Sequence, residues 1–302
     1  MKRVMKKLVR DYWLYLMLIP GITYFVIFKY MPMWGVLISM YEYQPFLGFL
    51  NSPWVGFRHF ERLFADQQFW KLFTNTLTIA IYNLVFYFPL PILLSLMMNE
   101  MMSNGLKRTI QSIIYMPHFM SWVVIYSLCV VLTSPTSGGF IAIMMEKITG
   151  SPVNVLASAK YFRTVVVLQS IWKECGWGTI IFMAALTAID PQLYEAARID
   201  GANRFQQNIH ITLPGIRGTI VTLLLLRIGR MLDTSFEQIY LMLNSMNRSV
   251  GNVFDTFVYD AGVKQGQYSY STAVGLFKSL VCLILVVSSN WLSKKLGEEG
   301  LF

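Results

Sequence analysis

Four ionisable side chains recur at helical spacing inside an otherwise apolar stretch, residues 218–243. Steps of three, three and four residues place them on one face of a continuous helix. An ionisable group within a membrane is costly unless it faces protein or water, so two interpretations follow. Either Arg230 pairs with Asp233 and the others pair with neighbouring helices, or the four form a wet stripe that lines a translocation path and whose guanidinium groups attract carboxylates. The four residues are Arg227, Arg230, Asp233 and Glu237.

A second polar group interrupts the preceding apolar stretch. Trp172, Lys173 and Glu174 are consecutive within residues 164–189. An indole can stack on the ring of a bound solute, and charged groups inside a membrane commonly mark a translocation path. The same Lys–Glu pair can instead serve only to hold helices together, and the sequence leaves both interpretations open.

The sequence offers no pattern for catalysis. Ser-His-Asp arrangements, paired carboxylates and metal-ligand spacings are absent, and His59, His118 and His210 have no partners at ligand spacing. The 302 residues also lack the GxxxxGK[ST] phosphate-binding loop. We therefore expect that the chain is not an enzyme and that it binds no metal and no cofactor of its own.

A polar segment, DPQLYEAARIDGANRFQQNIHITLPGIR at 190–217, lies between two apolar runs. Asp190 can cap a helix that begins at the following proline, and Gly201 can end that helix in a left-handed conformation. A second short helix over about 203–210 is expected to stop at Pro214, which would set the next span at a new angle. The pattern predicts an L-shaped element projecting from the membrane; an ordinary connector is the alternative.

The composition is typical of a polytopic membrane protein. Hydrophobic residues make up 55% of the chain and charged residues only 14%, whereas soluble domains are about a quarter charged. A formal charge of +9 would suggest a nucleic-acid partner for a soluble protein. Here the basic residues lie mainly at the ends of apolar runs, which indicates membrane topology and anionic lipid, and no nucleic acid.

Six apolar runs are long enough to cross a bilayer, so we expect an all-α membrane protein with six transmembrane helices. The short loops on one side carry more Lys and Arg than the longer loops on the other, which places both termini in the cytoplasm. Lys278 lies near the end of the last run and is expected to extend toward the membrane surface. The predicted spans are 12–39, 77–98, 110–132, 164–189, 218–243 and 272–292.

The polar segment resembles the EAA loop of binding-protein-dependent ABC importer permeases. E-A-A at 195–197, G at 201 and I-x-L-P at 211–214 occur at the family's spacing, after the fourth expected span. FWKLFTNTLTIA at 69–80 resembles the start of the type I permease domain, and FEQIYLML at 236–243 resembles carbohydrate-importer permeases of the MalF/UgpA kind. The resemblance implies the type I ABC importer permease fold.

In that family the EAA loop is the coupling helix, which sits in a cleft of a nucleotide-binding subunit. The resemblance implies that ATP binding closes two ATPase subunits and draws two such helices together, which rocks the spans between inward-open and outward-open states. ATP and Mg²⁺ would be used by the partner ATPase and not by this chain. The implied ATPase-interface residues are Glu195, Ala196, Ala197, Arg198, Asp200 and Gly201.

The stretch TFVYDAGVKQGQYSYSTAVGLFKSL at 256–280 is similar to the LplB/YteP branch of these permeases. That similarity implies complex or acidic, uronate-containing oligosaccharides as cargo. The implied partners are a second homologous permease that forms a heterodimer with this one, two ABC ATPase subunits, an extracellular solute-binding protein and membrane lipid. A self-contained secondary transporter or channel, which would need no ATPase, is the alternative function.

The resemblance also implies an organisation along the chain. The protein would be a multi-pass component of the bacterial cell (inner or plasma) membrane. The expected segments are a cytoplasmic tail at 1–11, a first span at 12–39, an extracellular segment at 40–68, the permease domain at 69–292 with its coupling loop at 190–217, and a cytoplasmic tail at 293–302.

Overall fold

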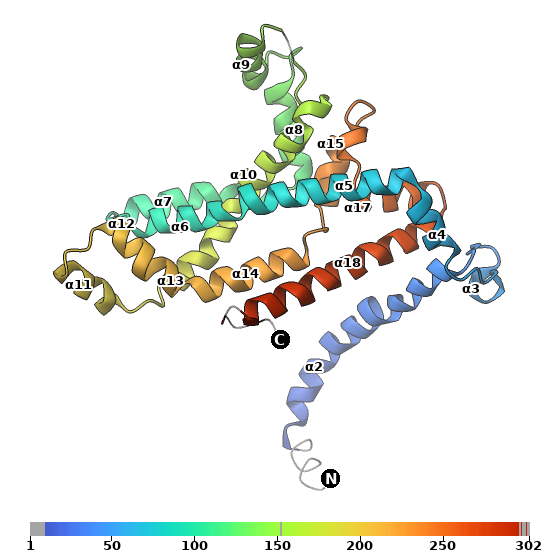
Figure 1. Ribbon diagram of the computed structural model, residues 1–302, viewed down its shortest axis with the longest axis horizontal. Coiled ribbons are helices and arrows are strands. Elements are labelled where there is room, and N and C mark those ends of the chain that lie inside the picture. Colours follow the sequence, from blue (N-terminus) through green and yellow to red (C-terminus); the bar gives the residue numbers. More distant parts are fainter. Residues whose placement is uncertain (1–9, 152, 296, 298–299, 301–302) are drawn as a thin grey trace. The chain divides into compact units, whose positions relative to one another are not determined.

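The computed structural model describes residues 10–151, 153–295, 297 and 300. The described chain is built from helices (Figure 1), which confirms the prediction of an all-α protein. It divides into two compact units. One comprises Met1–Ala65 and Asp260–Leu276, and the other comprises Asp66–Tyr259 and Phe277–Phe302.

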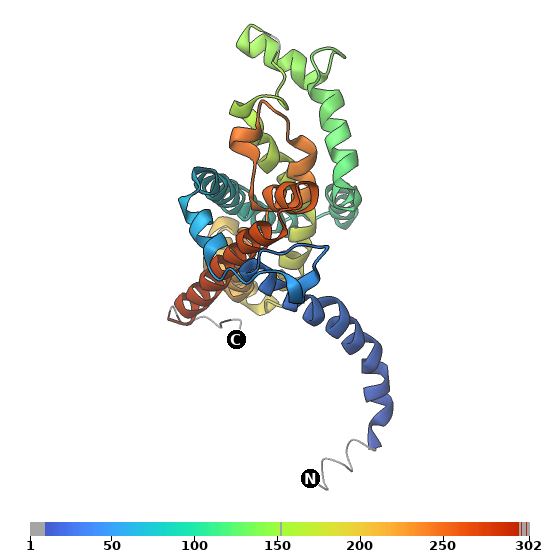
Figure 2. The same cartoon turned by 90° about the vertical axis from the view of Figure 1, so that its right-hand side faces the viewer.

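The first unit begins with one long helical run that changes type twice. Its 29 residues are apolar enough to cross a membrane, and α2 and η1 have no buried side chain. A helix that is apolar all round needs lipid or another protein about it. Figure 2 shows the run as one continuous, gently curving helix. Its parts are α2 (Tyr12–Phe25), η1 (Val26–Tyr30) and η2 (Met31–Met40).

A loop after this run is closed by polar and aromatic contacts within the first unit. Tyr41 and Trp54 form an isolated antiparallel bridge, and their rings meet edge to face at 4.9 Å. His59 Nε2 lies 3.1 Å from the Tyr41 carbonyl oxygen, and the Tyr43 N–H donates to Ser269 Oγ at 2.9 Å. These bonds tie the loop to the last helix. The elements are α3 (Gly48–Asn51), α4 (Arg58–Ala65), η6 (Tyr259–Lys264) and α18 (Tyr268–Lys295).

The second unit is organised around α10 (Ala159–Leu186), which packs against α5, α6, α7, α14 and α16. Phe162 and Val166 are fully buried near one end of α10, and Phe182 and Leu186 are buried near the other. The remaining elements are α5 (Gln67–Tyr82), η3 (Asn83–Tyr87), α6 (Pro89–Asn99), α7 (Asn104–Tyr115), η4 (Met116–Phe119), α8 (Trp122–Thr133), α9 (Phe140–Thr149), α11 (Pro191–Ile199), α12 (Arg204–Gln207), η5 (Asn208–Thr212), α13 (Leu213–Gly215), α14 (Arg217–Gly229), α15 (Phe236–Met242), α16 (Arg248–Gly251) and α17 (Phe254–Val258).

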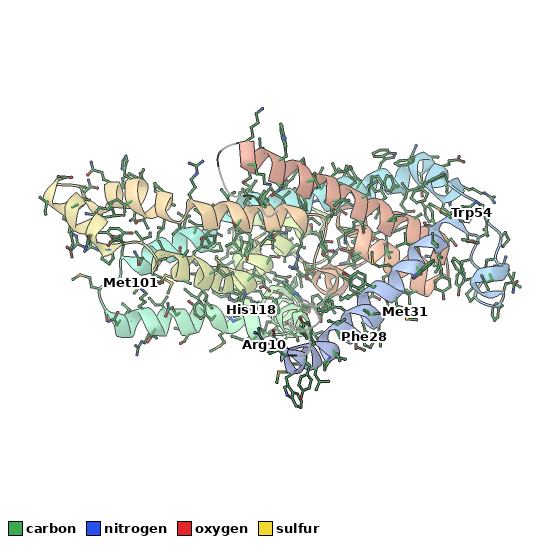
Figure 3. The ribbon with its side chains drawn as sticks, turned by 90° about the horizontal axis from the view of Figure 1, so that it is seen from below. Arg10, Phe28, Met31, Trp54, Met101 and His118 are labelled. Atoms are coloured by element: carbon green, nitrogen blue, oxygen red, sulfur yellow. The ribbon has the colours of Figure 1, made fainter. Side chains whose placement is uncertain are left out.

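The predicted third span is not one helix. The chain bends by 102° between Asn104–Phe119 and Trp122–Thr133. Pro117 tightens the end of the first helix into the 3₁₀ turn η4, and Met120 is extended. The Ser121 side chain then caps α8 by accepting from the Val124 N–H at 3.4 Å. Figure 3 labels Met101 just before α7 and His118 at this bend.

The predicted fifth span is also broken. Helix α14 ends at Gly229, and residues 230–235 form a turn before α15 begins at Phe236. Asp233, Thr234 and Ser235 favour turns because their side chains compete for backbone hydrogen bonds. The expectation that Arg227, Arg230, Asp233 and Glu237 share one continuous helical face is therefore wrong.

Three helices are long and apolar enough to cross a membrane by length and composition: Tyr12–Met40, Gln67–Asn99 and Tyr268–Lys295. Two bent pairs qualify if each counts as one span. These are the α7–α8 pair and the pair Arg204–Gly215 with Arg217–Gly229, which bends by 60°. Helix α10 carries Lys173 and Glu174 among its apolar residues. Six spans therefore stay a prediction.

Candidate functional site: a polar loop and a basic cavity

The polar loop folds locally as its sequence indicates. Asp190 Oδ1 accepts from the Gln192 N–H at 2.9 Å and caps α11. Gly201 adopts φ +79°, the left-handed conformation that lets a helix end without steric cost. A reciprocal capping box then starts α12, in which Asn203 and Gln206 each accept from the other's N–H at 2.8–2.9 Å.

Helical structure continues through Pro214, contrary to the expectation that this proline stops it. The π-helical turn η5 absorbs the missing N–H just before α13, and the 60° change of direction follows at Ile216. Gly215 permits close packing there, since a Cβ at this position would meet Ile189 Cδ1 at 2.9 Å. The bend therefore lies at Ile216, two residues after the proline.

The loop combines an exposed apolar surface with an ion pair to the end of α6. Ile199 is 87% exposed and Phe205 is 72% exposed, although both are apolar. Arg204 Nη1 donates to Glu100 Oε2 at 2.6 Å, just beyond the end of α6. A cavity of about 840 Å³ beside this ion pair includes Glu195 and Arg198 in its lining.

The other predicted ATPase-interface residues also lie on the outside of the loop. Glu195, Ala196, Asp200 and Gly201 are exposed, and Ala197 is half-buried. A second cavity, of about 360 Å³, is lined in part by Ala197, Asp200 and Gly201. The helix thus presents a small-residue surface that a partner can approach closely.

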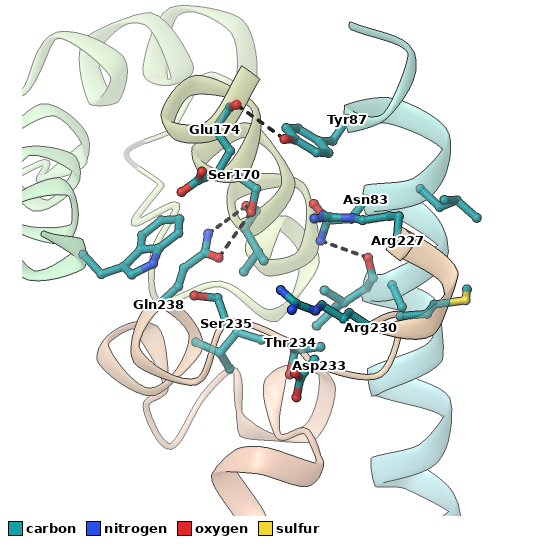
Figure 4. Close-up of a pocket in the computed structure, with 17 residues that line it drawn as sticks. Asn83, Tyr87, Ser170, Glu174, Arg227, Arg230, Asp233, Thr234, Ser235 and Gln238 are labelled. Carbon is teal, nitrogen blue, oxygen red and sulfur yellow. Dashed lines mark hydrogen bonds between the residues drawn. The ribbon is translucent and has the colours of Figure 1, made fainter. Parts of the chain in front are cut away.

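A separate cavity of about 240 Å³ lies at the broken fifth span (Figure 4). Its polar lining comes from five segments of the chain. Asn83 and Tyr87 come from η3, Ser170 and Glu174 from α10, and Gln238 from α15. The turn after α14 adds Arg230, Asp233, Thr234 and Ser235, and α14 itself adds Arg227.

The two arginines of this cavity form no ion pair with a described carboxylate, whereas the carboxylates Glu174 and Asp233 both have cationic or histidine partners. The Arg227 guanidinium carbon lies 4.8 Å from the centroid of the Tyr87 ring, a cation–π contact. Across residues 10–151 and 153–295, no carboxylate oxygen lies within 4.0 Å of a nitrogen of Arg227 or Arg230. The interpretation in which Arg230 pairs with Asp233 is therefore wrong.

Glu174 lines the cavity, and its carboxylate binds a histidine that does not line it. Glu174 Oε2 lies 2.8 Å from His118 Nδ1, and the His118 ring stacks on Trp177 at 4.6 Å. Lys173 Nζ donates to the carbonyl oxygens of His118 at 2.8 Å and Met120 at 2.5 Å. Lys173 therefore satisfies the free carbonyls at the bend of the third span.

The cavity brings together Glu174, Arg227, Arg230 and Asp233 from the predicted translocation path. Trp172, Lys173 and Glu237 are not among the residues that line it. Trp172 is 46% exposed, and the buried Lys173 points to the backbone of the third span. In the described part of the chain, no group of three His, Cys, Asp or Glu side chains could hold a metal ion.

Sequence reasoning missed Asn83, Tyr87, Trp122, Ser170 and Gln238, which also line the cavity. Asn83 and Tyr87 carried a signal, because polar atoms four residues apart share one helical face of an apolar span. The others had none, since the break that brings α15 to α10 was not predicted. Gln238 Nε2 donates to the Val166 carbonyl at 2.8 Å, and Ser170 Oγ lies 3.2 Å from Gln238 Oε1.

Residues 87–298, which include the loop and most of the residues that line the cavity, match the model of the family described as "Binding-protein-dependent transport system inner membrane component". The chain belongs to this family. As a transport permease it is a membrane protein, and the resemblance to ABC importer permeases is confirmed.

Two curated permeases of Bacillus subtilis (strain 168) are similar over nearly their whole length. Polygalacturonan/rhamnogalacturonan transport system permease protein YteP is 52% identical, over 100% of this chain and 94% of its own. Protein LplB is 53% identical, over 99% of this chain and 93% of its own.

Chains of solved ABC transporter structures are similar as well. One is a chain of a bacterial ABC transporter involved in the import of the acidic polysaccharide alginate, with a TM-score of 0.89 and 39% identity over 97% of this chain and 99% of that one. Another is from the bacterial alginate ABC transporter in complex with an alginate pentasaccharide-bound periplasmic protein. Its TM-score is 0.90, with 38% identity over 99% of this chain and 100% of that one.

Proposed function

We propose that this permease is one subunit of an ATP-driven importer for acidic oligosaccharides. The observation that carries the cargo class is the pair of cavity arginines, Arg227 and Arg230, without a carboxylate partner among the described residues. Guanidinium groups match carboxylates in geometry and remain charged at all physiological pH values. The names of relatives that carry polygalacturonan, rhamnogalacturonan and alginate support the same cargo.

The cavity is too small to enclose an oligosaccharide by itself. Its volume of about 240 Å³ falls below the roughly 300–1,000 Å³ of pockets for drug-sized ligands. We infer that a second, homologous permease forms a heterodimer with this chain and completes the path. Tyr87 and Trp122 would then offer aromatic faces to sugar rings, while the arginines take the carboxylates.

The energy source in this proposal is a pair of ABC ATPase subunits, because the chain itself has no phosphate-binding loop. They would use ATP and Mg²⁺ and contact α11 through Glu195, Ala196, Ala197, Arg198, Asp200 and Gly201. The exposed Ile199 and Phe205 support a protein partner here, since isolated apolar side chains on a polar loop gain from burial. The Arg204–Glu100 bond would pass the movement to α6.

The same proposal places six spans in the bacterial cell membrane, the third and fifth of them broken, with both termini in the cytoplasm. An extracellular solute-binding protein would deliver the sugar, as in the structural relative that contains a periplasmic protein. The permease domain would span residues 69–292.

Uptake of a matched pair of sugars tests the cargo assignment. The assembled importer in proteoliposomes would be given an oligogalacturonate and its carboxyl-reduced counterpart of the same length. We expect Arg227→Gln/Arg230→Gln to lose about tenfold or more in acidic uptake and to keep neutral uptake. Equal uptake of both sugars by this variant and by wild type would contradict an acidic cargo at this cavity. Import without any ATPase would favour a self-contained transporter.

A further inference from the structure

Lys278 occupies a polar cluster behind the basic cavity. The cluster lies ten residues into α18, and the Lys278 side chain is only 13% exposed. Lys278 Nζ donates to Asp233 Oδ1 at 2.6 Å and to Asp255 Oδ1 at 2.5 Å. The expectation that Lys278 extends toward the membrane surface is therefore wrong, because its ammonium group is held by two carboxylates inside the second unit.

Asp233 is the member of this cluster that borders the cavity. It lies three residues after Arg230 in the same turn, and its N–H donates to the Arg230 carbonyl at 2.9 Å. An aspartate in that position is within easy reach of the Arg230 guanidinium, and such a pair would remove the charge that an acidic ligand needs. The side chain instead turns to Lys278. Thr234 Oγ1 supports the arrangement by donating to Asp255 Oδ2 at 3.2 Å.

The balance of charge around the cavity depends on Lys278. Among the Lys, Arg, Asp and Glu side chains that line the cavity or belong to the ion pairs behind it, four are cations and three are carboxylates. One positive charge is therefore left over, and replacement of Lys278 by an uncharged residue would cancel it. Glu174 is arranged in the same way: its carboxylate binds His118, which does not line the cavity, rather than an arginine of the cavity. The cations are Lys173, Arg227, Arg230 and Lys278, and the carboxylates are Glu174, Asp233 and Asp255.

We propose that Lys278 is a positioning residue for cargo selectivity: it binds Asp233 and Asp255 and so keeps Arg230 and Arg227 available to the carboxylates of the sugar. This inference rests on the proposed import of acidic oligosaccharides. It adds a residue that never touches the cargo yet sets the charge the cargo meets.

The experiment uses the assembled importer in proteoliposomes with the unmodified binding protein, an oligogalacturonate and its carboxyl-reduced counterpart. We expect Lys278→Met to lower acidic uptake about tenfold, because a freed Asp233 neutralises Arg230, and to change neutral uptake less than twofold. Lys278→Arg keeps the charge and is expected to retain acidic uptake. Lys294→Met, on the exposed end of the same helix, is the matched control and is expected to behave as wild type.

The double variant Lys278→Met/Asp233→Asn separates this role from simple support of the fold. It restores the net charge of the wild-type cavity, so acidic uptake is expected to recover to within about threefold of wild type. If Lys278→Met lowers acidic and neutral uptake alike, or if the double variant recovers nothing, Lys278 is only structural and the inference is overturned.

The arginine variants show which proposal has failed. Selective loss of acidic uptake in Arg227→Gln/Arg230→Gln, with no selective loss in Lys278→Met, would overturn the role of Lys278 alone. Normal acidic uptake in the arginine variant would overturn the proposed cargo and, with it, the inference about Lys278.

Discussion

Gly176 sets the distance between α10 and α7, and its replacement by alanine should be damaging. A Cβ at this position would lie 2.2 Å from the Ile114 carbonyl oxygen and 2.7 Å from its carbonyl carbon, whereas real Cβ contacts almost never fall below 3.0 Å. The obstacle is backbone rather than a flexible side chain. Helix α7 would therefore have to withdraw by several tenths of an ångström.

Overpacking of this kind typically costs about 1–3 kcal/mol, which corresponds to a fall of roughly 2–10 °C in the apparent unfolding temperature of a protein of this size. The effect should also reach the cavity. Lys173 and Glu174 lie within one turn of Gly176, and they bind Met120 and His118 just after α7. A displaced α7 loosens those bonds, so we expect sugar uptake to fall together with stability.

The measurement is thermal unfolding of the purified importer in detergent, followed by uptake in proteoliposomes. Gly275→Ala in the interior of α18 is the control, because its Cβ would have no heavy atom within 4 Å and the change should stabilise by about 0.4–1 kcal/mol. An unfolding temperature for Gly176→Ala equal to or above that of wild type would refute the packing argument.

Three further substitutions test other parts of the structure. Lys173→Met removes the donor to two carbonyls at the bend of the third span and should cost about 1–3 kcal/mol, measured by thermal unfolding against the exposed control Lys160→Met. Glu100→Gln should lower the free energy of unfolding by less than about 1 kcal/mol, since the Arg204 side chain is 64% exposed. It should nevertheless raise the number of ATP molecules hydrolysed per sugar imported. An unchanged ratio would rule out coupling through this bond. Gly201→Ala should destabilise the loop by about 1–2 kcal/mol and weaken co-purification with the ATPase more than Gly201→Asn does, because asparagine tolerates the left-handed conformation; equal effects would contradict a conformational cause.

The local structure of the polar loop was predictable from the sequence. The Asp190 cap and the left-handed Gly201 each depend on one residue type at one position, and both are observed. Bends inside apolar runs were harder to predict, because periodicity treats a broken span and a continuous one alike. The Asp-Thr-Ser sequence at 233–235 and Pro117 both indicate a break in the helix. Each is flanked by hydrophobic residues on both sides, so the whole run still reads as one apolar span.

The wrong predictions about the charged residues of the fifth span share one physical cause. Arg227, Arg230 and Asp233 reach one cavity because the chain turns between them, and a continuous helix would have carried Glu237 there as well. Closeness in sequence therefore predicted well which of these residues line the same cavity, but it predicted poorly which side chains form ion pairs with each other. Asp233 pairs with Lys278, 45 residues away, and only the packing of α18 determines that choice.

The breaks in the predicted third and fifth spans separate the nearby charged residues into two roles. Ammonium groups hold the breaks together: the buried Lys173 binds the backbone at one, and the half-buried Lys278 binds Asp233 at the other. Exposed guanidinium groups, Arg227 and Arg230, remain on the cavity side. A compact ammonium on a flexible stem suits the first task and a planar fork suits the second. Exchange of Arg230 for lysine should therefore weaken acidic uptake by removing the fork, although the charge is conserved.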